Sequence, residues 1–130
     1  MIRIAIIDDD DMFCSELEKY LLDYDKSALD KLDIDIFYSG EGFLEYVKSN
    51  ESYDLIFLDI ELVKINGVEV GCMLRNELNQ DLMQIVYVSA REQYAMQLFQ
   101  NQPFHFLVKP INKSDIFDCL RRYEKRFSYH

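Results

Sequence analysis

The segment YDLIFLDI, residues 53–60, is an almost continuous apolar run with an acid, Asp59, next to its end. Its length and its content of Ile, Leu and Phe predict a β-strand. Successive side chains of a strand point to opposite faces of the sheet, and here the side chains on both faces are apolar. We therefore expect the strand to be covered on both faces, as the strands of a parallel sheet are. The segment therefore predicts a central strand of an α/β domain.

Strand-like and helix-like segments alternate on either side of this run. Four more strands are predicted, at 2–7, 33–39, 83–90 and 104–110. Five helices are predicted, at 12–24, from Ser39-Gly40 onward, after Asn66-Gly67, at 91–101 and after a cap at Ser114. Strand 33–39 alternates polar and apolar residues, which is typical of a half-buried edge strand. The pattern predicts a single flavodoxin-like (βα)5 domain whose doubly wound parallel sheet has the strand order 2-1-3-4-5.

The composition limits the partners of this domain. A chain of 130 residues that is 49% hydrophobic suits one globular core. Its net charge of −10 disfavours direct contact with nucleic acid or with an anionic membrane. Cys14, Cys72 and Cys119 lie far apart without metal-ligand spacing, which indicates reduced thiols. The apolar runs are too short to span a bilayer and the N-terminus lacks a signal-peptide pattern, so we expect a cytoplasmic protein.

Polar side chains follow the predicted strands where a doubly wound sheet binds its ligands, at the carboxyl ends. The first strand ends in Asp8-Asp9, the third in Asp59, the fourth in Ser89 and the fifth in Lys109. Three carboxylates gathered without a counter-charge would raise one another's pKa values, and a divalent cation would remove that penalty. An all-oxygen set of this kind suits Mg²⁺. The sequence therefore predicts a magnesium site at this edge of the sheet.

The same residues suggest a reaction. A carboxylate beside Mg²⁺ can attack phosphorus and form an acyl phosphate. Lys109 and the cation would neutralise the phosphoryl oxygens, and Ser89 would hydrogen-bond the third oxygen. The two remaining acids of the first loop, Asp10 and Asp11, suit the positive end of the dipole of the helix that follows. The arrangement predicts phosphoryl transfer.

Four segments in their order resemble the receiver domain of two-component response regulators, over essentially all 130 residues. They are IIDDDD (6–11), DLIFLDIELVKINGVEV (54–70), IVYVSA (85–90) and FHFLVKPI (104–111). The resemblance implies that Asp59 is the phosphoacceptor, and that Asp8 and Asp9 hold Mg²⁺, Asp9 more directly. It further implies that the backbone carbonyl of Glu61 completes the metal shell and that Lys109 binds the phosphoryl group.

The resemblance also implies a switch. Ser89 matches the switch hydroxyl, Phe106 matches the switch aromatic, and the Lys109–Pro110 bond is expected to be cis. A receiver of this kind catalyses only its own phosphorylation and autodephosphorylation, so it is not expected to be an enzyme in the usual sense. The implied partners are a sensor histidine kinase and an output domain or protein that contacts the face formed by helix 91–101, strand 104–110 and the last helix.

Three positions depart from the family pattern. Leu62-Val63 stands where Met-Pro is usual, although Gly67 is retained, so we expect a less rigid loop with its turn preserved. The switch aromatic is Phe106 rather than Tyr, so it has no hydroxyl with which to form a hydrogen bond. Glu61 and Arg91 flank the path of an attacking water and would set the lifetime of the acyl phosphate, in a direction that the sequence does not give.

Finer similarity is to receivers of the LytTR type, in YSGEGFLEYV (38–47) and EQYAMQLFQNQPFHFLVKPI (92–111). Such receivers are normally joined to a DNA-binding domain that regulates transcription. We therefore interpret residues 1–130 as the receiver domain, with the output domain absent from this chain, and allow a homodimer on phosphorylation. A stand-alone receiver that acts through protein contacts is the alternative.

Two other classes are less consistent with the sequence. A Mg²⁺-dependent phosphatase or phosphotransferase would need a second aspartate two residues after the nucleophile, where this chain has Glu61, and a cap insertion that 130 residues do not accommodate. A flavodoxin-like cofactor binder would need a phosphate loop rich in Ser, Thr and Gly after the first strand. Four aspartates stand there instead, and they would repel a phosphate.

Overall fold

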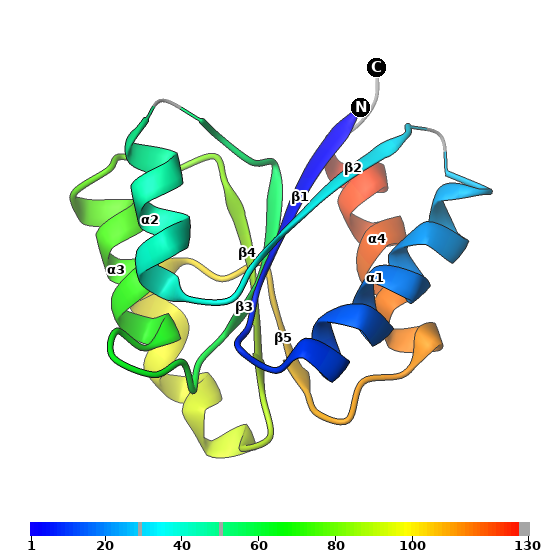
Figure 1. The fold of residues 1–130 in the computed structure, drawn as a ribbon. Coiled ribbons are helices and arrows are strands. Elements are labelled where there is room, and N and C mark those ends of the chain that lie inside the picture. The colour runs from blue at the N-terminus through cyan, green and yellow to red at the C-terminus, as the bar shows by residue number, and fades with distance from the viewer. Residues whose placement is uncertain (29, 50, 128–130) are drawn as a thin grey trace.

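The computed structural model describes residues 1–28, 30–49 and 51–127, and its elements alternate as the sequence predicts (Figure 1). The strands are β1 (Ile2–Ile7), β2 (Leu32–Phe37), β3 (Leu55–Asp59), β4 (Gln84–Ser89) and β5 (His105–Val108). The helices are α1 (Asp11–Asp25), α2 (Gly40–Lys48), α3 (Gly67–Asn76), the 3-10 helix η1 (Glu92–Asn101) and α4 (Lys113–Phe127). Since η1 precedes β5, the helix expected as the fifth is labelled α4.

All five strands are parallel, in the order β2-β1-β3-β4-β5, which confirms the predicted topology. Figure 1 shows three layers: α1 and α4 cover one face of the sheet, and α2, α3 and η1 cover the other. Strand β3 lies at the centre and is buried at every residue, whereas the edge strand β2 is half-buried. Within the described residues, no helix is both long and apolar enough to cross a membrane.

The apolar run that predicts β3 supplies both halves of the core. Leu55 and Phe57 pack into the cluster beneath α1 and α4, and Ile56 and Leu58 pack into the cluster beneath α2 and α3. Neighbouring residues of a strand point to opposite faces, so a strand between two helical layers needs an apolar side chain at each position. This double burial fixes the position of Asp59, the last residue of the strand.

Side chains cap the helices α1, α2 and α3 at their starts. Asp10, Ser39 and Asn66 accept hydrogen bonds from the first-turn amides of α1, α2 and α3. The predicted cap at Ser114 is wrong, because α4 begins at Lys113 and Asn112 Oδ1 accepts from the amide of Asp115. A capping oxygen must precede the first helical residue to reach that amide, and Asn112 is at that position while Ser114 lies within the turn.

The predicted helix 91–101 is the 3-10 helix η1, which begins at Glu92 and runs for ten residues, an unusual length for this geometry. Its first residue has no side-chain cap, and only Leu98 and Asn101 are buried. The C-terminal end is fixed by the buried Arg75 of α3, whose guanidinium donates to the carbonyls of Asn101 and Gln102. The element is therefore anchored at its end more than along its length.

Candidate functional site

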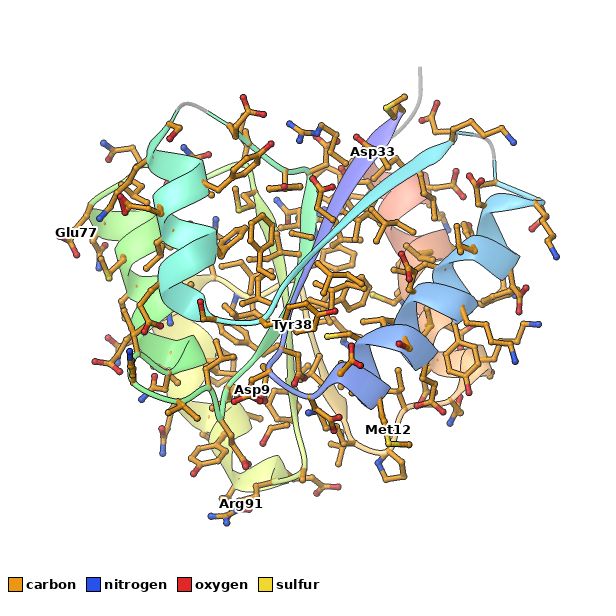
Figure 2. All side chains as sticks on the ribbon, in the orientation of Figure 1. Asp9, Met12, Asp33, Tyr38, Glu77 and Arg91 are labelled. Atoms are coloured by element: carbon orange, nitrogen blue, oxygen red, sulfur yellow. The ribbon has the colours of Figure 1, made fainter. Side chains whose placement is uncertain are left out.

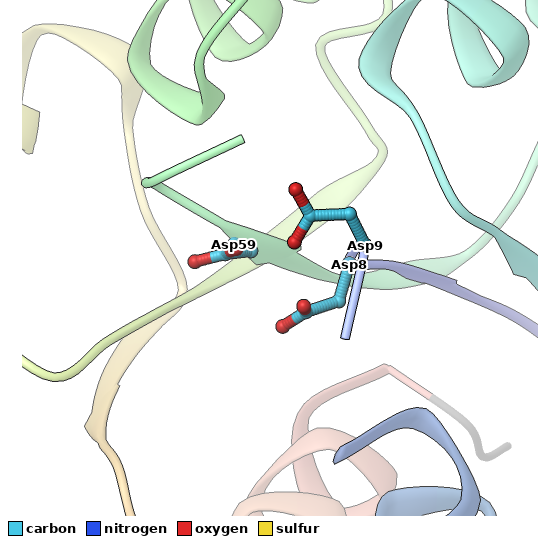
Figure 3. A group of neighbouring side chains, drawn as sticks. All are labelled: Asp8, Asp9 and Asp59. Carbon is cyan, nitrogen blue, oxygen red and sulfur yellow. The ribbon is translucent and has the colours of Figure 1, made fainter. Parts of the chain in front are cut away.

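The three acids predicted to bind metal lie together at the carboxyl edge of the sheet. Asp8 and Asp9 follow β1, and Asp59 ends β3, the strand that pairs with β1. One carboxylate oxygen from each lies within 4.8 Å of the others, and Figure 3 shows the three groups side by side. Asp8 and Asp59 are buried, whereas Asp9 is exposed. The site is therefore open to solvent at Asp9.

Main-chain amides hold the two buried carboxylates in place. The amide of Asp10 donates to Asp8 Oδ1 at 2.9 Å, and the amide of Glu61 donates to Asp59 Oδ1 at 3.1 Å. Each donor is two residues beyond its acceptor, so the turn that ends each strand also orients the acid at its end. The thiol of Cys14 donates to the carbonyl oxygen of Asp8 at 3.3 Å, a contact that sequence reasoning did not anticipate.

Lys109 brings the counter-charge. Its Nζ lies 2.9 Å from Asp8 Oδ2 and 3.9 Å from Asp59 Oδ1. The ammonium also lies over the ring of Phe13, 4.3 Å from its centroid. The backbone amide of Lys109 donates to the carbonyl of Ser89, and the Lys109–Pro110 bond is cis, as the resemblance implies. One lysine thus bridges the acids of two neighbouring strands.

The charges at the site are unbalanced. Burial raises the pKa of Asp59 to about 6, with a further increase from the charge of Asp8. Burial also raises the pKa of Asp8, although the hydrogen bond from Lys109 opposes the increase. Burial disfavours the charged form of Lys109, yet its contacts with Asp8 and Asp59 raise its pKa above the ordinary value. The mutual destabilisation predicted for the acids is therefore present, and a cation would relieve it.

The donor set fits Mg²⁺. The side chains offer hard carboxylate oxygens, and the exposed side leaves room for water and phosphoryl oxygens, as this cation prefers. The main chain at Glu61 runs directly beside Asp59, because its amide donates to that carboxylate. Coordination by the carbonyl of Glu61 stays a prediction.

Ser89 lies at the end of β4 with its hydroxyl turned toward the loop after β3. The hydroxyl is buried, donates to Glu61 Oε1 at 3.0 Å and accepts from the amide of Arg91 at 3.0 Å. Arg91 Nε lies 3.7 Å from the same carboxylate oxygen. Phe106 is half-buried against the core beneath α3 and η1, so its role as a switch stays a prediction.

Gly67 has a steric role that its place in the sequence only suggested. A Cβ atom at this residue would lie 2.3 Å from the carbonyl oxygen of Asp59 and 2.7 Å from Cα of Ile60. The amide of Gly67 instead donates to the carbonyl of Ile60, which closes the loop. Within that loop Leu62 is buried, Val63 is exposed and Lys64 has a φ of 66°. The absence of the usual Met-Pro therefore leaves the turn intact, as expected.

This chain is similar to known signal transduction proteins. A family model described as the response regulator receiver domain matches residues 4–121. The sensory transduction protein LytT of Bacillus anthracis is 32% identical over 126 residues, which are 97% of this chain and 48% of that protein. LytT of Bacillus subtilis (strain 168) is 30% identical over 125 residues, covering 96% of this chain and 49% of the relative. The chain thus spans about half the length of the curated relatives it matches.

Solved structures agree with the fold. A two-component response regulator from Clostridium difficile has a TM-score of 0.82 at 26% identity, with 99% of this chain and 100% of that chain covered. The response regulatory domain of protein mrkE from Klebsiella pneumoniae has a TM-score of 0.81 at 22% identity, with 96% and 97% covered. The order of the strands, the acids at their ends and the match over residues 4–121 lead to one conclusion. The chain belongs to the response regulator receiver domain family, and LytT-type regulators are among its relatives.

Proposed function

We propose that Asp59 accepts a phosphoryl group from a sensor histidine kinase, with Mg²⁺ held by Asp8, Asp9, Asp59 and the backbone carbonyl of Glu61. The observation that supports this most is the convergence of three carboxylate oxygens within 4.8 Å, two of them from buried residues. Carboxylates this close destabilise one another's charged forms, and a bound divalent cation would relieve that destabilisation. When bound, Mg²⁺ supplies charge neutralisation for the acids and for the transferred phosphoryl group.

The residues of the chain prepare Asp59 as the nucleophile. A pKa of about 6 keeps most of the carboxylate ionised at pH 7, and the amide of Glu61 orients it. A carboxylate oxygen of Asp59 attacks phosphorus as the bond to the leaving group breaks, and the electron pair of that bond stays on the leaving group. Lys109, already 3.9 Å from Asp59, stabilises the phosphoryl oxygens, and Ser89 and Phe106 then change position.

The surroundings give a phosphodonor access. An open pocket of about 530 Å³ lies beside Lys109 and is bordered by Met12, Phe13 and Pro110. Figure 2 shows Met12 at the same end of the molecule as Asp9 and Arg91. We assign the approach of the kinase to this end because it holds both the carboxylates and the pocket.

The same proposal includes the output domain that the receiver controls. The chain spans about half of each LytT relative, which supports a receiver that controls a LytTR-type DNA-binding domain and thereby transcription in the cytoplasm. Phosphorylation changes the affinity of the face formed by η1, β5 and α4 for the output domain, for a partner protein or for a second copy. A stand-alone receiver would use the same face. A phosphatase is disfavoured, because this class needs a second aspartate two residues after the nucleophile, where the chain has Glu61.

The test is intact-mass spectrometry after incubation with acetyl phosphate, in Mg²⁺ and in EDTA. We expect a single phosphoryl adduct in Mg²⁺ and none in EDTA. Asp59→Asn should abolish the adduct, whereas the control Asp118→Asn, which changes an exposed acid on α4, should keep it. Equal labelling of Asp59→Asn would refute the assignment of the phosphoacceptor.

A further inference from the structure

The hydroxyl of Ser89 is engaged in the protein as it stands, without a phosphoryl group on Asp59. It donates to Glu61 Oε1 and accepts from the amide of Arg91, both at 3.0 Å. Arg91 directly precedes η1, and its side chain lies 3.7 Å from the same oxygen of Glu61. Glu61 therefore joins three segments: the loop after β3, the end of β4 and the start of η1.

The proton of this hydroxyl can serve one acceptor only. A serine hydroxyl has a single O–H donor. While Ser89 donates to Glu61, it cannot donate to a phosphoryl oxygen on Asp59. The contact seen here and the contact proposed for the phosphorylated protein are therefore mutually exclusive, and one must break before the other forms.

Phosphorylation supplies a force that separates Glu61 from Ser89. Glu61 is two residues from Asp59, and its backbone amide donates to that acid at 3.1 Å. A phosphoryl group on Asp59 adds negative charge to a site whose three carboxylates Mg²⁺ and Lys109 already balance, so excess negative charge lies near Glu61, and like charges repel. The Glu61 side chain is 39% exposed and that of Arg91 is 59% exposed, so both can turn outward into solvent.

We propose that the Glu61 side chain is an inhibitory clasp, which keeps the Ser89 hydroxyl away from Asp59 in the unphosphorylated receiver. This inference rests on the proposed phosphorylation of Asp59 and identifies the contact that phosphorylation must displace. Glu61 is a positioning residue, because its side chain acts on the transfer site through Ser89. One hydrogen bond to a charged group favours the unphosphorylated arrangement by about tenfold or more.

The first test uses the protein without metal or phosphoryl group. NMR scalar couplings report the χ1 rotamer of Ser89, and we expect one rotamer in the wild type. Glu61→Ala should populate further rotamers, because the amide of Arg91 alone does not hold the hydroxyl, whereas Glu61→Gln should keep one, because its amide oxygen still accepts the proton. The control Glu92→Ala removes an exposed acid beside Arg91 and should behave like the wild type. A single unchanged rotamer in Glu61→Ala would overturn the clasp.

The second test measures the affinity for beryllofluoride, a phosphoryl analogue, in the presence of Mg²⁺. Glu61→Ala should bind it about tenfold more tightly, since no hydrogen bond has to be broken. Glu61 would also repel the anion directly, and a double-mutant cycle with Ser89→Ala separates the two effects. In the Ser89→Ala background, only a few-fold effect of the exposed charge should remain. Equal effects of Glu61→Ala in both backgrounds would leave charge repulsion alone and overturn the clasp.

The outcomes for the wild type separate the clasp from the function on which it rests. A wild type that takes neither the phosphoryl adduct nor beryllofluoride would refute the proposed function, and with it any inhibitory role of Glu61. A wild type that takes both, together with additive effects in the cycle, would refute the clasp alone. Thermal melting of each variant checks folding, and the partial exposure of Glu61 makes a large loss of stability unexpected.

Discussion

Asp59 is a largely buried carboxylate, 5% exposed, and its protonation should therefore affect stability. Its pKa of about 6 exceeds the ordinary value of 3.8, so the folded protein binds more protons than the unfolded chain between these pH values. In EDTA, the free energy of unfolding should fall as the pH rises from 4 to 6, by up to roughly 3 kcal/mol. Urea unfolding at pH 4, 6 and 8 measures this dependence.

Asp59→Asn provides the matched comparison. The amide can still accept from the amide of Glu61 but carries no charge, so the variant should be more stable than the wild type in EDTA at pH 8. In this variant, the free energy of unfolding should also decline much less between pH 4 and 6 than it does in the wild type. The control Asp118→Asn should keep that decline. An unchanged profile in Asp59→Asn would show that another group is responsible.

Lys109 should matter to the reaction more than to the fold. Its Nζ is the one described ammonium within 4 Å of Asp59, and removing a positioned donor of this kind costs about a hundredfold in rate. We expect Lys109→Ala to fold and to take the phosphoryl group from acetyl phosphate about a hundredfold more slowly. Lys113→Ala, which removes a lysine paired with Asp23 outside the site, should react at the rate of the wild type. Equal rates for the two variants would remove Lys109 from the mechanism.

Single residues differ in how far the sequence could predict them. Asp8, Asp9, Asp59, Ser89 and Lys109 could be found, because strand order alone brings the ends of neighbouring strands together. The hydrogen bond between Glu61 and Ser89 could not, because it joins side chains 28 positions apart, one of them in a loop. No periodic pattern constrains such side chains, so their partners become known only with the structure.

Among the elements, the loop between β3 and α3 depends on Gly67. Because a Cβ atom there would lie 2.3 Å from the carbonyl oxygen of Asp59, Gly67→Ala must move the loop away from the acceptor. We expect a loss of about 2 kcal/mol or more in the free energy of unfolding and slower phosphorylation. Gly42→Ala is the control, because a Cβ atom there meets only Ser39 Oγ at 3.1 Å and alanine favours the helix. It should change stability by about 1 kcal/mol or less. Similar losses in both variants would contradict the steric argument.

Helices and strands could be predicted from the sequence where the pattern of buried residues determines them. The continuous run of β3 and the alternation of β2 follow from the number of faces that each strand buries, and both were correct. The 3-10 geometry of η1 was not predictable, since only two of its residues are buried and its first residue lacks a cap. At the start of α4, Asn112 and Ser114 are both good caps, and the first helical residue decides between them.

For the whole molecule, the sheet order could be predicted because the second strand alternates like an edge strand, the first, third and fourth look central, and this pattern matches the doubly wound order. The net charge of −10 is also a property of the whole molecule. It argues against nucleic acid as a direct partner. Neither feature identifies the kinase or the output. Those depend on surface side chains, which the pattern of buried residues does not constrain.

The central position of β3 also implies a gradient of local unfolding across the molecule. A strand hydrogen-bonded on both sides and buried on both faces opens only when the whole domain unfolds. The start of η1 has no side-chain cap and few buried residues, so opening it costs little free energy. Amide hydrogen exchange should therefore be slowest in β3 and fastest in the first half of η1, with protection returning toward the carbonyls that Arg75 holds. Uniform exchange over the two elements would contradict this. The acceptor thus lies on a strand that opens only with the whole domain, near a helix that opens more readily.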